Sequence, residues 1–419
     1  MDAIQFSTLG AVVGLVVAIF LIIKKVHPAY SLILGALIGG LIGGGGLTGT
    51  VSTMVTGASS MMSSVLRILT SGILAGALIK TGSAEKIADV IVKKLGQKFA
   101  LVSVSVATMI ICAVGVFIDI SVITVAPIAM AIAVKADINK PAVLLAMIGG
   151  GKAGNIISPN PNTIATAEAF EIDLTALMIR NIVPALVALV VTILLSTLLS
   201  KKNEVKVTEK DLGEVEEKKL PSFIAAISGP LVVIILLALR PICSISIDPL
   251  IALPVGGVVS MLCCGQIKHI VSYTEFGLSK VVGVSILLIG TGTLAGIIKA
   301  SAIQYDMISL LEIANIPSFL LAPIAGILMA AATASTTAGA TVASQTFSGT
   351  LISSGVSAID AGAMIHAGAT VVDSLPHGSF FHATGGSVNM QIKERMKLIP
   401  YEALVGLTST VVSCLIYIL

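Results

Sequence analysis

"GGGKAGNIISPNPNTIATAE", residues 149–168, decides the fold of this chain. It places one lysine, three asparagines, two prolines and four glycines in a sequence that is otherwise mostly valine, leucine, isoleucine and alanine. Pro159 and Pro161 remove amide donors and restrict the residues that precede them, so "SPNPN" at 158–162 cannot lie within a continuous helix. We therefore expect two half-helices, 142–157 and 163–170, that meet at this interruption.

The rest of the chain has the composition of an integral membrane protein. Of its 419 residues, 56% are hydrophobic and 11% are charged, and the mean hydropathy of +1.05 lies far outside the range of soluble domains. Apolar runs that approach the roughly 20 residues of a membrane-spanning helix occur at 4–23, 30–45, 182–200, 222–239 and 401–419. The alternating segments of a membrane barrel are absent, so we expect an all-α polytopic membrane protein.

Several other classes of protein are not indicated. The first apolar run lacks a basic flank and a cleavage pattern, so we interpret it as a retained helix. The five cysteines show no metal-ligand spacing, and the net charge of +3 is spread over loops, so neither a metal, a cofactor nor nucleic acid is implied. No HExxH motif or nucleophile elbow occurs, and we expect no enzymatic activity.

The chain divides into two similar halves. The charged stretch 201–221 is interpreted as a cytoplasmic linker between a first repeat, 1–200, and a second repeat, 222–419. Residues match across it in order, at a separation that drifts only from 221 to 216. The matched pairs are Pro28 with Pro249, Gly35 with Gly256, Leu74 with Leu294, Met147 with Met364, Pro159 with Pro376, and Pro184 with Pro400. This ordered match predicts an internal duplication.

The basic residues predict how the repeats cross the membrane, because cytoplasmic loops carry the lysine and arginine excess. The loops assigned to the cytoplasm contain Lys24, Lys25, Lys86, Lys93, Lys94, Lys98, Lys135, Lys140, Lys201, Lys202, Lys268, Lys393, Arg395 and Lys397. This pattern requires about five crossings per half, so the second repeat is inverted and both termini face outward. The assignment treats 51–67 as an interfacial segment rather than a crossing.

Three further segments share the irregular, polar character of 149–168. Asp119 lies at the centre of the apolar stretch 100–134, which is too long for one helix and predicts a re-entrant hairpin with Asp119 at its tip. In the second half, 331–346 is rich in serine, threonine and glycine, and 369–386 is broken at Pro376 and Gly378. Each repeat is therefore expected to contain one hairpin and one broken helix, with all four irregular segments converging.

The residues around these breaks predict a site for a small, hydroxyl-rich anion. Half-helix N-termini would offer unpaired N–H groups, and buried charges are retained mainly where they pair or function. Lys152 could bind a carboxylate, pair with Asp119 or Asp373, or extend to the interface. The candidate substrate-binding residues are Lys152, Asn155, Ser158, Asn160, Asn162, Thr163, Ser335, Thr336, Thr337, Thr341, Ser374, His377 and Ser379. The candidate proton-coupling residues are Asp119, Asp373 and His382.

Structural roles remain open for several of these side chains. The asparagines could serve turn chemistry alone, and the serines and threonines of 335–341 could bond back to their own helix. His377 and His382 could be proton shuttles or hydrogen-bonded structural residues. Asp119 could cap a helix or form a structural ion pair.

The sequence resembles the gluconate permease (GntP) family of the ion transporter superfamily. The resemblance is carried by "FIDISVITVAPIAMAIAVKADI", by "SPNPNTIATAEAFEIDL" and by the segment 331–346. The family pattern has a glutamate in place of Asp119 and a Pro-Pro-His-Pro-Gly type of turn in place of "SPNPN", and it lacks a counterpart of Lys152. The resemblance implies proton-coupled import of gluconate, a related sugar acid or hydroxy acid, or D-serine.

The sequence therefore predicts a secondary active transporter of the inner (plasma) membrane. Its expected activity is symport of a small hydroxylated carboxylate with protons, or with sodium as the coupling ion, and the superfamily implies a homodimer in the lipid bilayer. The alternative is a cation/proton antiporter, in which Asp119, Asp373 and Lys152 would carry the ion chemistry. Two opposed broken sites favour alternating access over a channel.

Overall fold

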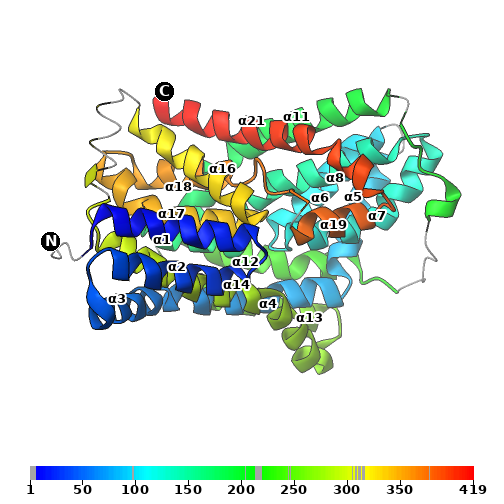
Figure 1. Cartoon of the computed structure of the whole chain (residues 1–419). Coiled ribbons are helices and arrows are strands. Elements are labelled where there is room, and N and C mark those ends of the chain that lie inside the picture. Colours follow the sequence, from blue (N-terminus) through cyan, green and yellow to red (C-terminus); the bar gives the residue numbers. More distant parts are fainter. Residues whose placement is uncertain are drawn as a thin grey trace.

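The computed structural model consists of helices joined by short turns (Figure 1). It describes residues 6–96, 99–202, 204–212, 219–243, 245, 247–303, 305–306, 309, 313, 317–376 and 378–419, with the backbone alone at 240–243. In this described part no strand is found beyond two isolated β-bridges, so the expectation of an all-α protein is confirmed. The long helices run side by side, from left to right in the view of Figure 1.

The helices of the N-terminal half follow one another with short connections. They are α1 (Thr8–Ile23), α2 (Pro28–Ile42), α3 (Gly46–Ser60), α4 (Met62–Lys80), α5 (Ser83–Leu95), α6 (Ala100–Ala113), α7 (Ile118–Lys135), α8 (Lys140–Asn155), α9 (Pro161–Ala169), α10 (Leu174–Arg180) and α11 (Ile182–Ser200).

The C-terminal half contains a corresponding series. It comprises α12 (Phe223–Cys243), α13 (Pro249–Cys263), α14 (Ile270–Lys299), α16 (Leu321–Thr333), α17 (Thr336–Ser353), α18 (Ala358–Gly368), α19 (Ser379–Gly386), α20 (Ile392–Met396) and α21 (Ile399–Ile418). Both halves contain a helix pair, α6–α7 or α16–α17, followed by a broken helix, α8–α9 or α18–α19. The expected half-helices and hairpins are therefore present at the expected positions.

The length and apolar character of several helices suit a membrane. Among the described residues, five helical segments are long and apolar enough to cross one, and the shorter apolar helices include α1, α2, α6 and α13. Their outward faces carry exposed leucine, isoleucine and valine side chains, of which Leu9, Val190 and Ile234 are more than half exposed. A surface of this kind is expected where lipid tails replace water.

The segment 51–67, for which an interfacial position is predicted, belongs to two helices. It spans the junction between α3 and α4, at Met61, and both helices pack along the single long helix α14. A Cβ added at Gly57 would lie 2.2 Å from the carbonyl oxygen of Gly292, so the α3 backbone touches that of α14. Residues 46–80 therefore form one nearly continuous element along α14.

The contact between α4 and α14 is equally close, and it needs glycine on both sides. A Cβ at Gly277 would lie 1.9 Å from the carbonyl oxygen of Gly72, and one at Gly76 would lie 2.3 Å from that of Tyr273. Helices that pack in lipid have little hydrophobic driving force, so they gain from such close backbone approach. Helices α3, α4 and α14 thus form a closely packed group that lies beneath α1 and α2 in Figure 1.

The charged linker lies against the body of the protein. Lys206 of the linker forms a bridge with Asn139, and its ammonium lies 2.7 Å from the Asp137 carboxylate. The Lys140 ammonium lies 2.5 Å from Asp211 of the linker and donates to the Asn389 carbonyl at 3.2 Å. Burial alone would raise the pKa of Asp211, but the hydrogen bond from Lys140 and those from Thr208 lower it below its ordinary value. The described part of the linker is therefore a docked segment.

Alanine substitution at two glycines of α14 tests the glycine contact. Gly277→Ala should destabilise the protein by roughly 1–3 kcal/mol, because the new methyl group has no space beside Gly72. Gly283→Ala is the matched control on the same helix, where a Cβ would meet nothing within 4 Å. It should be neutral or slightly stabilising, since alanine favours helix more than glycine does. Thermal unfolding midpoints in detergent decide, and equal midpoints would contradict the tight contact.

Candidate functional site

The first broken helix is closed by its own asparagines. Asn160 caps α9, because its Oδ1 accepts from the backbone N–H of Asn162 at 3.0 Å and from that of Thr163 at 3.1 Å. The Asn160 Nδ2 donates to the backbone oxygen and to Oδ1 of Asn155, and Asn162 donates to the same Oδ1 at 3.1 Å. The expectation that α9 offers free N–H groups to an anion is therefore wrong for these two amides, because turn chemistry satisfies them first.

The second break contains an acid, Asp373, whose charge is balanced by a lysine from the first broken helix. The Asp373 carboxylate lies in the segment 369–378 between α18 and α19, and its Oδ1 is 2.7 Å from the Lys152 ammonium of α8. The hydroxyl of Thr336, the first residue of α17, donates to Asp373 Oδ2 at 2.6 Å. Ser374 donates to Oδ1 at 3.4 Å. One carboxylate thus joins residues of three of the four irregular segments.

Lys152 and Asp373 are almost completely buried, with 2% and 1% of their side chains exposed. Besides Asp373, the Lys152 ammonium donates to the backbone oxygens of Thr370 and Glu402. All three N–H donors of the ammonium are therefore used, and Lys152 neither pairs with Asp119 nor extends to an interface. An ionised pair placed this deep costs several kcal/mol of desolvation, so each charge depends on the other.

Each hairpin tip lies against the break of its own half. Gly115, in the turn between α6 and α7, has a positive φ of 107° and packs against Pro159 and Leu74. In the second half, Gly378 approaches the backbone of Ala334, which forms the turn between α16 and α17 with φ 46°. The breaks and tips therefore form one continuous polar region inside a bundle of apolar helices.

Among the described residues, neither Asp119 nor His382 bonds Lys152 or Asp373. Asp119 is in the first turn of α7, where its carboxylate accepts from the backbone N–H of Ile120, and no ion pair of Asp119 is found in the part of the chain that is described. His382 is exposed, and its ring Nε2 lies 2.8 Å from the Pro376 carbonyl oxygen. Both contacts join residues that are near one another in the sequence.

The remaining predicted residues differ in burial and partners. Ser335 caps α17 by accepting from the Ala338 N–H at 3.3 Å, Thr337 is partly buried, and Ser379 is exposed. Ser158 and Thr341 are fully buried, and their hydroxyls have no hydrogen-bond partner among the described residues. The Asn155 Nδ2 is likewise unpartnered there. His377 lies outside the described residues.

Three groups of charged or polar residues were not predicted from the sequence. The first is Arg395, buried and paired with Glu402, whose backbone oxygen supports Lys152. The second is His366, which is fully buried in α18. The only signal for His366 was a titratable residue in the apolar run "AMIHAG".

The third group surrounds a cavity of about 330 Å³ between α4, α9, α10 and the start of α13. Arg67 reaches into it, donates to Asp248 Oδ1 at 3.0 Å and Oδ2 at 2.6 Å, and pairs with Glu168 of α9. Because α9 begins at the first break, this cavity lies beside the polar region and joins it to α4. The sequence shows Arg67 as a single arginine near the start of α4, and its two acidic partners could not be predicted because they are distant in the sequence.

Neutralising the buried pair tests its energetics. Lys152→Gln or Asp373→Asn alone should destabilise the protein by about 3–5 kcal/mol, because each leaves the other charge buried without a partner. The double variant should recover much of that loss. Unfolding midpoints in detergent measure all three.

The matched control for this cycle is the exposed pair of Lys93 and Asp89 on α5. Its N–O distance is 2.8 Å and 74% of the lysine side chain is exposed, so Lys93→Gln should cost about 1 kcal/mol or less. If Lys152→Gln costs no more than Lys93→Gln, the buried pair does not stabilise the breaks.

Comparison with known proteins is consistent with this architecture. Residues 6–419 match the GntP family permease. The chain is 56% identical over 411 residues to an uncharacterized transporter of Haemophilus influenzae, covering 98% of both chains. It is 21% identical to the D-serine transporter DsdX of Escherichia coli, over 78% of each chain, and 24% identical to the high-affinity gluconate transporter of that species, over 57% of this chain and 54% of that one.

A solved structure shares the fold. The YdaH transporter of Alcanivorax borkumensis, described as having an unusual topology, superposes with a TM-score of 0.66 over 88% of this chain and 87% of that chain. The two sequences are 14% identical. The likeness therefore concerns the arrangement of helices.

Proposed function

Because the chain belongs to the GntP family of permeases, we propose that it is a secondary active transporter that imports a small hydroxylated carboxylate together with protons. The observation that carries this proposal is the buried pair of Lys152 and Asp373, which joins the two breaks. Gluconate and serine, the solutes in the names of two relatives, share a carboxylate and a hydroxyl group. A related sugar acid or hydroxy acid fits the same description.

In the proposed cycle, Asp373 occupies the place of the solute carboxylate when the site is empty. A proton that binds Asp373 removes its charge and weakens its bond to Lys152. The ammonium can then take the carboxylate of the solute. This exchange assigns Asp373, rather than Asp119 or His382, as the coupling acid.

Charge balance explains why movement of proton and solute would be coupled. The empty site holds one positive and one negative charge, and so does the site that holds both the proton and a monovalent carboxylate. A site with the proton alone would be positive, and a site with the solute alone would be negative. Both carry an uncompensated charge through the membrane interior, which is costly, so the neutral states reorient.

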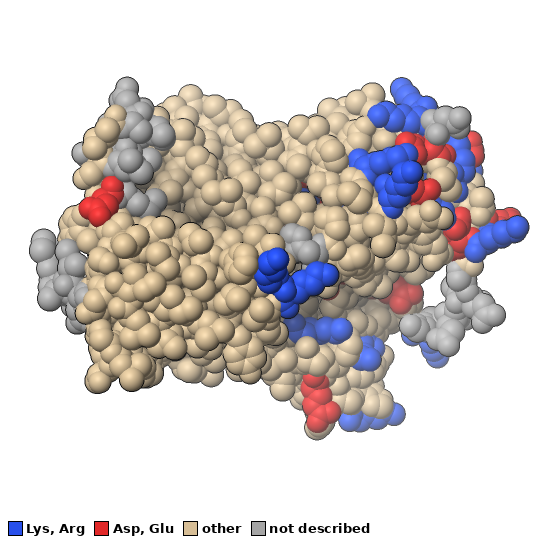
Figure 2. Space-filling model, viewed as in Figure 1, with Lys and Arg blue, Asp and Glu red and all other residues tan. Residues whose placement is uncertain are grey.

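The arrangement of helices supports the proposed inverted repeats. In Figure 1, α1 begins on the left and α11 ends on the right, whereas the C-terminal half ends on the left with α21. In Figure 2, most of the lysine and arginine side chains on the visible face lie toward the right, and the left carries almost none. By the positive-inside rule the right side is cytoplasmic. We propose an inner-membrane homodimer whose subunits have both termini outside.

Labelling of single cysteines tests this topology. In a background without native cysteines, replacements at Lys93 and Lys393 should react from the cytoplasmic side, and one at Ser309 from outside. Reactivity of Lys93 and Lys393 replacements from opposite sides would contradict inversion, since these positions lie in different repeats.

Uptake of labelled gluconate into proteoliposomes tests the transport cycle. An inward proton gradient should drive accumulation, of up to about tenfold per pH unit for one proton per solute. Asp373→Asn mimics the protonated acid, so it should exchange gluconate across the membrane without concentrating it. Asp119→Asn and His382→Gln should still concentrate it.

Three other outcomes distinguish the alternatives. If Asp119→Asn abolishes accumulation and Asp373→Asn does not, Asp119 is the coupling acid. Accumulation driven by a sodium gradient alone would show that the coupling ion is sodium and not the proton. Absence of gluconate uptake, combined with collapse of a pH gradient on addition of sodium, would indicate the cation/proton antiporter.

A further inference from the structure

His366 of α18 is a buried titratable residue without partners. None of its side chain is exposed, and neither ring nitrogen has a hydrogen-bond partner in the described part of the chain. A buried polar group without a partner destabilises the folded protein, because it has lost its hydrogen bonds to water. An imidazole in a core usually avoids that cost, so its two free nitrogens indicate a missing ligand.

The position of His366 follows from its neighbours along the chain. Four residues before it, Gly362 lies against Thr166 and Phe170 at the end of α9, each 3.4 Å from a Cβ built on it. Residues spaced by four share a helix face, so His366 lies on the face of α18 toward α9. Two residues after His366 the helix ends at Gly368, and just beyond that end the backbone oxygen of Thr370 accepts the hydrogen bond from Lys152.

The register between the helices places His366 opposite the first turn of α9. Chain direction fixes this, because α18 runs into the second break and α9 runs out of the first, and Lys152 with Asp373 joins the two breaks. The helices are thus antiparallel, and one turn from Gly362 toward the break corresponds to one turn from Thr166 toward Asn162.

Thr341 of α17 reaches the same level. Thr336 of α17 bonds Asp373 at the break, and Ser344 donates to Thr166 at 3.3 Å. Thr341 lies between these two contacts, and its hydroxyl is unpartnered. Two further unpartnered groups, Asn155 Nδ2 and the Ser158 hydroxyl, belong to the adjoining first break.

The surroundings of His366 provide no charge to pair with it. Helices α16 and α17 contain no ionisable residue. On the other helices packed against α18, each charged side chain is already paired with a group other than His366. These pairs are Glu168 with Arg67, Arg180 with Asp360, and Glu402 with Arg395. An uncharged imidazole offers one donor and one acceptor, which matches a hydroxyl group better than a carboxylate.

We propose that His366 recognises a hydroxyl group of the solute whose carboxylate Lys152 holds, and that it thereby selects hydroxylated carboxylates over plain ones. The inference rests on the proposed function and specifies which residue of that site gives its specificity. Thr341 and His366 together form the rim of this proposed hydroxyl site. A solute without hydroxyls would leave these buried groups unpaired, and sites of this kind discriminate strongly.

Binding to the purified full-length protein tests the proposal, with D-gluconate, D-glycerate and propionate as probes. Propionate is a three-carbon carboxylate like glycerate but lacks its hydroxyls. The wild-type protein should bind glycerate at least about tenfold more tightly than propionate. His366→Phe should reduce this ratio about tenfold by weakening glycerate and gluconate only. His366→Gln, which keeps a donor and an acceptor, should retain most of the ratio.

A matched control is Ser413→Ala on α21, another buried hydroxyl without a partner in the described chain, which should leave the ratio unchanged. If His366→Phe is not recovered folded, Thr341→Val decides in its place, because it preserves volume and removes one rim hydroxyl. An unchanged ratio overturns the inference, and so does equal weakening of glycerate and propionate, which indicates a structural role. If the wild-type protein binds none of the three acids, the proposed function itself fails and the inference with it.

Discussion

The ion pair between Lys152 and Asp373 is the interaction on which the polar centre depends. The two groups come from opposite halves of the chain and are almost completely buried, so removal of either would leave an isolated charge far from water. Their remaining bonds recruit Thr336 from a hairpin tip and the backbone of Thr370. The pair is therefore one of the contacts that hold one half against the other. It does so with groups that a proton can uncouple.

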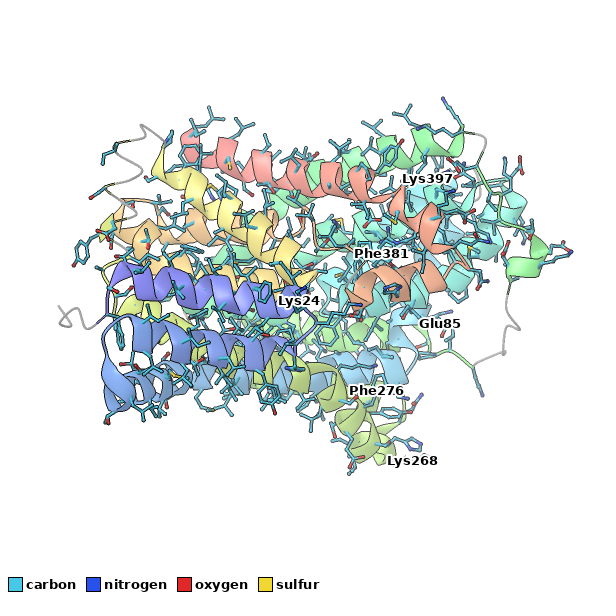
Figure 3. All side chains as sticks on the ribbon, in the orientation of Figure 1. Lys24, Glu85, Lys268, Phe276, Phe381 and Lys397 are labelled. Carbon is cyan, nitrogen blue, oxygen red and sulfur yellow. The ribbon has the colours of Figure 1, made fainter. Side chains whose placement is uncertain are left out.

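Away from this centre, close backbone contact between helices is a second source of stability. Figure 3 shows Lys24, Lys268 and Lys397 at or near the ends of helices, and the long helix faces to the left of them carry mostly apolar side chains. Glycines at 72, 76 and 277 bring α4 and α14 into backbone contact, as those at 57 and 292 do for α3. Such contacts gain dispersion energy without polar groups. The apolar scaffold and the polar centre are thus stabilised by different forces.

The sequence could predict the main features of the fold because their causes are local. Two prolines within five residues interrupt the helix between α8 and α9 whatever the surrounding structure, and long apolar segments form helices in lipid. The close contact of 51–67 with α14 could not be predicted in this way. It depends on Gly57, the single glycine of that segment, and on Gly292, which is distant in the sequence.

Pairing within the site could not be predicted, because it depends on contacts between distant residues. Lys152 had two candidate acids. Nothing in the sequence states that Asp373, 221 positions from it, lies 2.7 Å away while Asp119 contacts the backbone of its own helix. Arg67 with Glu168 and Asp248 is a similar case. His366 was overlooked because one histidine in an apolar run usually packs with a partner, and only the folded chain shows that the described residues supply none.

The two breaks differ in a way that bears on where a proton could act. The first is closed by asparagine amides, which do not titrate, and its α9 terminus is capped by Asn160. At the second, no side chain caps α19, and the only titratable side chain described between α18 and α19 is Asp373, which borrows its counter-charge from the first half. Protonation of Asp373 would therefore act on its bond to Lys152 and not on the asparagine bonds of the first break. The one titratable side chain described in the second break is thus also one of the groups that join the two halves.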